Sequence, residues 1–243
     1  MASPNGLRRR EFLFAGFPFF WRNTGRARLA GIDFLVRRTG QGGRRYLLIH
    51  GDESTARRVL LDHMKTRPGV AHLVINETRT VAFEGGKLDP NRLFSRAGAE
   101  RNLRRLNPSW TQPGLDRALD RLDRERPKLL RAILPARGAL LVALHNNARG
   151  YSMQDEIPIS DRTALNEPQR PHEFMLATSP ADFERLANGP HNVLLQSRPT
   201  GDDDGSLSRL AAREGIRYVN IEAGIGEQAR QSAMLEFLER SLP

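Results

Sequence analysis

Short runs of strand-like residues alternate with segments of helical periodicity from residue 31 onward, and this alternation strongly constrains the fold. In residues 54–67, for example, Val59, Leu60 and Met64 share one helix face, whereas residues 139–144 form an uninterrupted apolar run, typical of a strand buried on both faces. The pattern predicts an α/β fold, here a single three-layer α/β/α sandwich around a mostly parallel mixed sheet. The expected strands cover residues 32–37, 46–50, 70–75, 80–83, 139–144, 193–197 and 218–221, and the expected helices cover residues 54–67, 95–105, 115–133, 180–187, 204–214 and 227–242.

Two connections carry strong turn or loop signals, and one predicted helix contains a proline. Residues 39–43 contain three glycines and are expected to join the first two strands directly. Pro127 lies inside the helical pattern of residues 115–133 and predicts a kink or break there. Residues 149–171 have little periodicity and three prolines, so we expect a long surface loop of the kind that often shapes a site.

The first 30 residues differ from the rest of the chain. Arg8, Arg9 and Arg10 precede the apolar stretch 12–21, an order of residues that is typical of twin-arginine export signals. We therefore expect an apolar and basic arm over residues 1–30, which packs on a single domain formed by residues 31–243 or serves as a signal or tether. A cytoplasmic location is the favoured interpretation, and export through this N-terminus is the alternative.

The composition narrows the chemistry that the chain can perform. It has no cysteine, which excludes disulfides and thiolate sites and leaves histidine, carboxylate and hydroxyl groups. All but three of its 38 basic residues are arginine, and the net charge is +10. This bias reflects either a GC-rich coding sequence or attraction of an anionic ligand; because the arginines are scattered along the chain, we expect no nucleic-acid partner. No apolar run reaches 18 residues, so no transmembrane span is expected.

Polar side chains that could bind a metal lie at the ends of predicted strands. His50 ends the second strand and Glu53 follows three residues later, His145 ends the run 139–144, and Glu222 ends the last predicted strand. Ligands of open parallel sheets bind at the carboxyl ends of the strands. Two imidazoles and a carboxylate form a common catalytic zinc set, and a further carboxylate nearby can act as general base.

The order of these and neighbouring motifs resembles a known family. The chain contains, in sequence, His50-Gly51-Asp52-Glu53, Arg79, Asp89-Pro90-Asn91-Arg92, Leu144-His145-Asn146 and Asn220-Ile221-Glu222-Ala223. This set resembles the zinc metallocarboxypeptidase superfamily, and most of all its succinylglutamate desuccinylase and aspartoacylase branch, over about residues 45–240. The specificity of the resemblance lies in the ordered set of motifs.

The resemblance implies a role for each matching residue. It implies that one zinc ion per chain is bound by His50, Glu53 and His145, and that Asp89 accepts a hydrogen bond from the non-ligating nitrogen of His50. It further implies the roles of the remaining matching residues: Asn91 and Arg92 bind a substrate carboxylate, Arg79 stabilises the oxyanion, and Glu222 transfers the proton of the attacking water.

The expected function is zinc-dependent hydrolysis of an amide bond next to a free carboxylate, as in carboxypeptidases, on a small peptide or acyl amino acid. One alternative is an N-acyl amino acid deacylase of the aspartoacylase and succinylglutamate desuccinylase type. The other alternative is a non-enzymatic, Arg-rich module that binds anions or nucleic acid. The sequence leaves the substrate, the oligomeric state and the metal used in the cell open.

Other polar and aromatic residues are expected to have mainly structural roles. His63 and His72 lie within a helical and a strand pattern, respectively, and are expected to be packed or hydrogen-bonded histidines. Residues 202–204 are three aspartates, expected at a solvated turn before a helix. Tyr151 and Tyr218 are expected either to line a cleft or to lie in the core or at the rim of the cleft.

Overall fold

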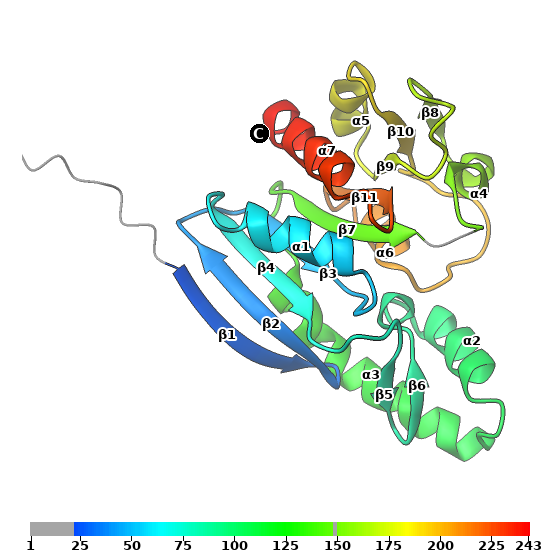
Figure 1. Ribbon diagram of the computed structural model, residues 1–243. Coiled ribbons are helices and arrows are strands. Elements are labelled where there is room, and N and C mark those ends of the chain that lie inside the picture. Colours follow the sequence, from blue (N-terminus) through cyan, green and yellow to red (C-terminus); the bar gives the residue numbers. More distant parts are fainter. Residues whose placement is uncertain (1–21, 148–149) are drawn as a thin grey trace, which may run out of the picture.

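A mixed sheet forms the centre of the computed structural model, which describes residues 22–147 and 150–243 (Figure 1). Within these residues the sheet has nine strands in the order β1-β2-β4-β3-β7-β11-β9-β10-β8, and a separate two-stranded hairpin consists of β5 and β6. The strands are β1 Arg22–Leu29, β2 Ile32–Thr39, β3 Arg45–Leu48, β4 Gly69–Val74, β5 Val81–Phe83, β6 Gly86–Leu88, β7 Leu141–Asn147, β8 Arg162–Ala164, β9 Phe174–Ala177, β10 Asn192–Leu195 and β11 Tyr218–Gly224.

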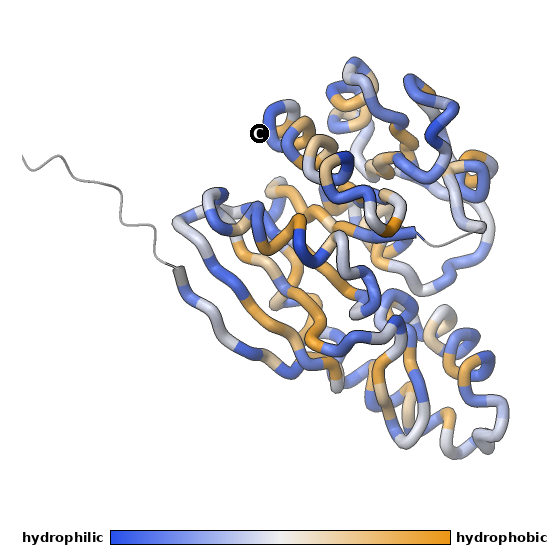
Figure 2. Tube along the Cα trace, in the orientation of Figure 1, coloured by the Kyte–Doolittle hydropathy of each residue, from blue (hydrophilic) through white to orange (hydrophobic). Residues whose placement is uncertain are grey.

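The helices pack on both faces of this sheet. They are α1 Ser54–His63, α2 Arg96–Leu106, α3 Gln112–Ile133, α4 Met153–Glu156, α5 Pro180–Ala187, α6 Leu207–Arg213 and α7 Gln228–Ser241. One apolar cluster contains residues of α2, α3 and α6, and a second contains residues of α1, α5 and α7. Strand β7 supplies both clusters in turn, with Leu141 and Ala143 in the first and Val142 and Leu144 in the second. Figure 2 shows the hydrophobic residues concentrated along the central strands.

The predicted fold class is confirmed: the chain is α/β with a mixed, mostly parallel sheet. The pairs β4–β3, β3–β7, β7–β11 and β10–β9 are parallel, and the first three of these pairs make four adjacent central strands run in the same direction. The antiparallel pairs lie outside this centre, at β1–β2, β2–β4, β11–β9 and β10–β8. The direction shared by β3, β7 and β11 brings their carboxyl ends to one edge of the sheet.

Several details differ from the prediction. Strands β2 and β3 are not neighbours in the sheet, because β4 pairs with both of them. Helix α3 continues through Pro127 without a break. The segment expected to be a long loop contains α4 and β8, and β9 was not predicted at all. Ser206 accepts a hydrogen bond from the Arg209 amide, so α6 begins at Leu207, after the three aspartates.

The N-terminal region is described only in part. Residues 22–29, which fall within the predicted arm, form β1 and pair with β2 along its full length. The twin-arginine-like segment lies outside the described residues. Among the helices that are described, none combines the length and the apolarity that a membrane span requires.

Candidate active site

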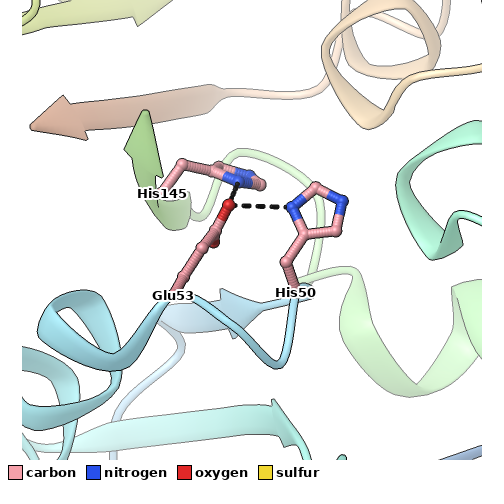
Figure 3. A group of neighbouring side chains, drawn as sticks. All are labelled: His50, Glu53 and His145. Atoms are coloured by element: carbon pink, nitrogen blue, oxygen red, sulfur yellow. Dashed lines mark hydrogen bonds and ion pairs between the residues drawn. The ribbon is translucent and has the colours of Figure 1, made fainter. Parts of the chain in front are cut away.

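The three predicted metal ligands converge at the carboxyl edge of the central strands (Figure 3). His50, Glu53 and His145 each offer one ligand atom, and these atoms lie within 4.8 Å of one another. Glu53 Oε1 lies 2.9 Å from His50 Nδ1 and 3.1 Å from His145 Nδ1. All three side chains are buried, with at most 5% of any residue exposed.

The local fold explains this convergence. His50 lies two residues after the end of β3 and Glu53 directly precedes α1, so the short turn between them places both side chains over the sheet edge. Gly51 is required in this turn, because a Cβ atom there would lie 2.1 Å from the backbone oxygen of Asn76. His145 extends from β7, and the neighbouring Asn146 accepts a hydrogen bond from the Ala56 amide, which fixes α1 against β7.

Asp89 lies behind His50, on the side away from Glu53. Its Oδ1 atom is 2.8 Å from His50 Nε2 and also accepts a hydrogen bond from the backbone amide of Asn91. The Asp89 amide in turn donates to the side chain of Asn102 on α2. With Nε2 engaged by Asp89, the Nδ1 atom of His50 is the nitrogen that faces the cluster.

The electrostatics of the cluster favour a bound cation. Burial lowers the pKa of His50, but hydrogen bonds and charges from Asp89 and Glu53 outweigh it and raise this pKa to about 9. Burial raises the pKa of Glu53, but the charge of His145 and the hydrogen bonds from both histidines lower it to about 2. The second carboxylate oxygen of Glu53, Oε2, is buried without a hydrogen-bond partner. Two imidazole nitrogens and this unpartnered carboxylate oxygen therefore fit a divalent metal such as Zn²⁺.

Glu222 lies on the adjacent strand, in register with His145. Burial raises the pKa of Glu222 above its usual value, and the charge of His145 partly opposes this shift. The Asn220 amide group donates to Glu222 Oε1 at 3.0 Å. A buried carboxylate with a raised pKa is a stronger base than an exposed one and can accept and release a proton during a reaction.

The other predicted site residues lie around the same cavity, which has a volume of about 410 Å³. Arg79 lies 3.7 Å from Glu53 and 3.6 Å from Asp89, and its side chain is about half exposed. Asn91 uses its side-chain oxygen to accept a hydrogen bond from the Leu207 amide.

Arg92 has an acidic neighbour that is distant in the sequence. Asp204, from the segment before α6, lies 3.5 Å from the Arg92 guanidinium. Both side chains of this pair are partly exposed, so the pair is weak and other donors of Arg92 remain free for a ligand.

Tyr151 and Tyr218 line the cavity, and Tyr218 is also part of the first apolar cluster, so both expected roles apply to Tyr218. Glu156, Gln196 and Arg209 also belong to the cavity wall, and the sequence did not indicate them. Glu156 and Arg209 belong to short helices, and Gln196 follows β10, so no spacing in the sequence links them to the histidine motifs. His63 and His72 are packed away from the cluster, against Tyr46 and Phe34, respectively.

Comparisons with known proteins found similarity among solved structures alone. No model of a known protein family matches the chain, and no curated protein matches it. The structure of a succinylglutamate desuccinylase/aspartoacylase from Rhodobacter sphaeroides matches with 15% identity and a TM-score of 0.49, over 93% of this chain and 66% of that protein. A candidate metallopeptidase from Shewanella denitrificans matches with 12% identity and a TM-score of 0.44, over 91% and 85% of the two chains.

A third match is the ectoine utilization protein EutE (DoeB) from Ruegeria pomeroyi, with 18% identity and a TM-score of 0.44, over 85% of this chain and 59% of that one. The chain thus spans less than two thirds of the length of the first and third of these proteins. The first of these proteins bears the name of the branch that the motifs resemble. The likeness is one of fold. At such identities the chemistry has to be derived from the side chains of this chain.

Proposed function

We propose that this chain is a zinc-dependent hydrolase that cleaves an amide bond next to a free carboxylate, as a carboxypeptidase does. The observation that carries the proposal is the orphaned, buried Glu53 Oε2 within the convergent His50, Glu53 and His145 cluster. A buried carboxylate oxygen without a partner is costly, and a metal ion would satisfy it. Glu222 lines the same cavity as this cluster, which adds the proton-transfer group that such hydrolysis needs.

The metal would be held by His50, Glu53 and His145, one ion per chain. When bound, zinc supplies a Lewis acid for the scissile carbonyl and makes a water molecule acidic enough to react at neutral pH. Asp89 supports this arrangement, because its hydrogen bond to Nε2 fixes the ring orientation of His50.

The remaining steps fall to the chain's own side chains. Glu222 would accept a proton from the attacking water and deliver it to the nitrogen of the leaving amine, a transfer that its raised pKa favours. Arg79 would stabilise the negative charge that develops on the carbonyl oxygen. Arg92 and the amide group of Asn91 would bind the substrate carboxylate, for which a guanidinium is a suitable partner.

Metal analysis of the purified protein tests the first part of this proposal. We expect about one zinc per chain in the wild type and a strong loss in the double variant His50→Ala, His145→Ala. His63→Ala provides a matched control, because His63 lies on α1 and contacts Tyr46 instead of the cluster. Wild-type zinc content in the double variant would contradict the assigned ligands.

A substrate panel tests the second part. Peptides with free and amidated C-termini are compared with N-acyl amino acids, and release of amine is measured. Preferred cleavage of the C-terminal peptide bond supports the carboxypeptidase-like activity, whereas preferred cleavage of acyl amino acids indicates the deacylase alternative. A zinc-loaded protein that cleaves neither class would overturn the proposal and favour the non-enzymatic, anion-binding alternative.

A further inference from the structure

Glu156 is an acidic residue of the cavity wall that the proposed reaction does not use. It is the last residue of α4, within the segment that the sequence presented as a loop. Its two carboxylate oxygens have separate partners: Oε1 accepts a hydrogen bond from the Tyr151 hydroxyl at 2.7 Å, and Oε2 accepts one from the Gln196 amide at 2.6 Å. Both donors thus hold the carboxylate in one orientation.

The partners of Glu156 carry no charge. Within the part of the chain that the structure describes, no arginine, lysine or histidine nitrogen forms an ion pair with it, whereas Glu53 lies near Arg79 and Asp204 lies near Arg92. Arg209 lines the same cavity, but its Nη1 atom donates to the backbone oxygen of Pro199 at 2.8 Å. Among the described residues, Glu156 is therefore a partly buried carboxylate without an ion-pair partner.

The geometry leaves this carboxylate able to accept more hydrogen bonds. A carboxylate offers about four acceptor positions, and Tyr151 and Gln196 occupy two of them. The positions that remain suit an ammonium or a guanidinium group, which carries only donors.

Tyr151 also links Glu156 to the reacting end of the cavity. Tyr151, Glu156 and Glu222 line the same cavity. Burial, followed by the charges of Glu222 and Glu156, strongly raises the pKa of the Tyr151 hydroxyl, and the charge of Arg92 partly opposes this shift. A substrate whose amide bond lies at Glu222 would have its neighbouring groups within this part of the cavity.

We propose that Glu156 binds a cationic group of the substrate, so that the site prefers amide substrates that carry a basic side chain in addition to a free carboxylate. This inference rests on the proposed function and specifies its substrate class. Glu156 is a specificity-determining residue that contacts the substrate, while Tyr151 and Gln196 are positioning residues that orient its oxygens. A lysine- or arginine-type residue has the required chemistry.

Two substrates that differ in one charge test the inference. Benzoyl-glycyl-lysine and benzoyl-glycyl-norleucine have side chains of similar length, but only lysine carries the ammonium group. We expect the zinc-loaded wild type to have the higher kcat/KM for the lysine substrate. In Glu156→Gln this preference should fall roughly ten- to a hundredfold, the range for loss of one charge-assisted hydrogen bond, while cleavage of the norleucine substrate changes little.

Glu184→Gln is the matched control, because it removes one negative charge from an exposed residue outside the cavity wall. It should leave the preference for the lysine substrate unchanged. Glu156→Asp keeps the charge on a shorter side chain and should retain part of the preference, which a merely structural role in holding Tyr151 and Gln196 would not predict. An unchanged lysine preference in Glu156→Gln would overturn the inference, as would a loss of the same size in Glu184→Gln.

A binding measurement separates this inference from the proposed function. Calorimetric titration of the zinc-loaded protein with free lysine, arginine and norleucine requires no turnover. Tighter binding of lysine and arginine in the wild type, lost in Glu156→Gln, would support the cation site even if no amide bond is cleaved. Equal binding of lysine and norleucine by the wild type would overturn the cation site, even if amide hydrolysis by the zinc-loaded protein is established.

Discussion

At the scale of single residues, the burial of Glu222 is the property on which the proposed proton transfer depends. Replacement by glutamine keeps the size of the side chain and an oxygen that can accept from Asn220, but it removes the group that accepts the water proton. We expect Glu222→Gln to keep the fold and the zinc content and to lower kcat by about 10²- to 10⁴-fold. Steady-state kinetics on zinc-verified protein measures the effect.

Glu227 provides the control for this substitution. It is an exposed carboxylate that precedes α7, five residues after Glu222, and is not part of the cavity wall. Glu227→Gln should retain wild-type activity. If Glu222→Gln also retained it, another residue would have to act as the base.

The substrate carboxylate leads to a second prediction at this scale, which concerns Arg92. We expect amidation of the carboxylate to lower kcat/KM roughly 10- to 150-fold, the range for a charge-assisted hydrogen bond. Arg92→Ala should cause a similar loss with the free acid and little further loss with the amide, because both changes remove the same contact. Kinetics of both enzymes on both substrates gives this comparison directly.

Asp204 supplies the control for Arg92. It is the acidic group nearest to the Arg92 guanidinium, at 3.5 Å, and it competes with a bound carboxylate. Asp204→Asn should therefore keep the affinity for the free acid or increase it. If the losses from Arg92→Ala and from amidation of the substrate were additive when combined, Arg92 would not contact the carboxylate.

The residues that the sequence revealed and those that it missed differ in a physical way. The sequence indicated that three residues lie together: His50, His145 and Glu222. Runs of apolar residues show where the strands end, and the carboxyl ends of parallel strands share one edge of a sheet. The positions of Glu156 and Gln196 at the cavity depend on how α4 and the segment after β10 fold back over that edge. Their contact across 40 positions of the sequence is a tertiary interaction that no local pattern encodes.

At the scale of helices and strands, the missed elements share weak or ambiguous patterns. Strand β1 has only Ala27 and Leu29 as apolar residues, and its pairing with β2 determines its conformation. Strand β9 is a buried run of four residues, which is too short for its periodicity to separate strand from helix. Prediction succeeded where amphipathic segments were long, as in α3, and failed where pairing partners decide the structure.

Within β4, His72 makes the stability of the fold depend on pH. It is 4% exposed, and burial, followed by the charges of Arg45 and Arg38, lowers its pKa to about 4. An unfolded chain binds a proton at this residue near pH 6.5, whereas the folded chain does not until about pH 4. Stability is therefore lost as the pH falls from about 6.5 to about 4.

Urea unfolding at pH 7 and pH 5 measures this contribution. His72→Leu removes the titrating group, so its free energy of unfolding should fall by about 2 kcal/mol less than that of the wild type between these two values of pH. His172→Leu serves as the control, since His172 is exposed, and it should respond to pH as the wild type does. Equal pH responses of wild type and His72→Leu would contradict the assigned burial effect.

At the scale of the whole molecule, the site joins segments that are far apart in the sequence. His50 and Glu53 flank the turn between β3 and α1, His145 extends from β7, and Asp89 lies in the connection between the β5–β6 hairpin and α2. Helix α7 closes the arrangement from the C-terminal side, because Gln231 donates to the backbone oxygen of His145. A cation bound at this cluster would therefore connect the β3–α1 turn with β7 directly, and it would connect α2 and α7 through Asp89 and His145.

This connection predicts that removal of the metal destabilises the entire domain. A ligand that binds only the folded state stabilises it by RT ln(1 + [L]/Kd), or about 2.7 kcal/mol when the free ligand is at a hundredfold excess over Kd. A chelator should therefore lower the Tm of the wild type, and added zinc should restore it. The metal must also displace the proton that His50 holds with a pKa of about 9, so the stabilisation should weaken as the pH falls.

The variant His50→Ala, His145→Ala has lost both imidazole ligands, and its Tm should not respond to either addition. Thermal unfolding of both proteins at pH 8 and pH 6, with chelator and with zinc, measures these effects; a wild-type Tm that is the same with chelator and with zinc would show that no metal is linked to folding at this site.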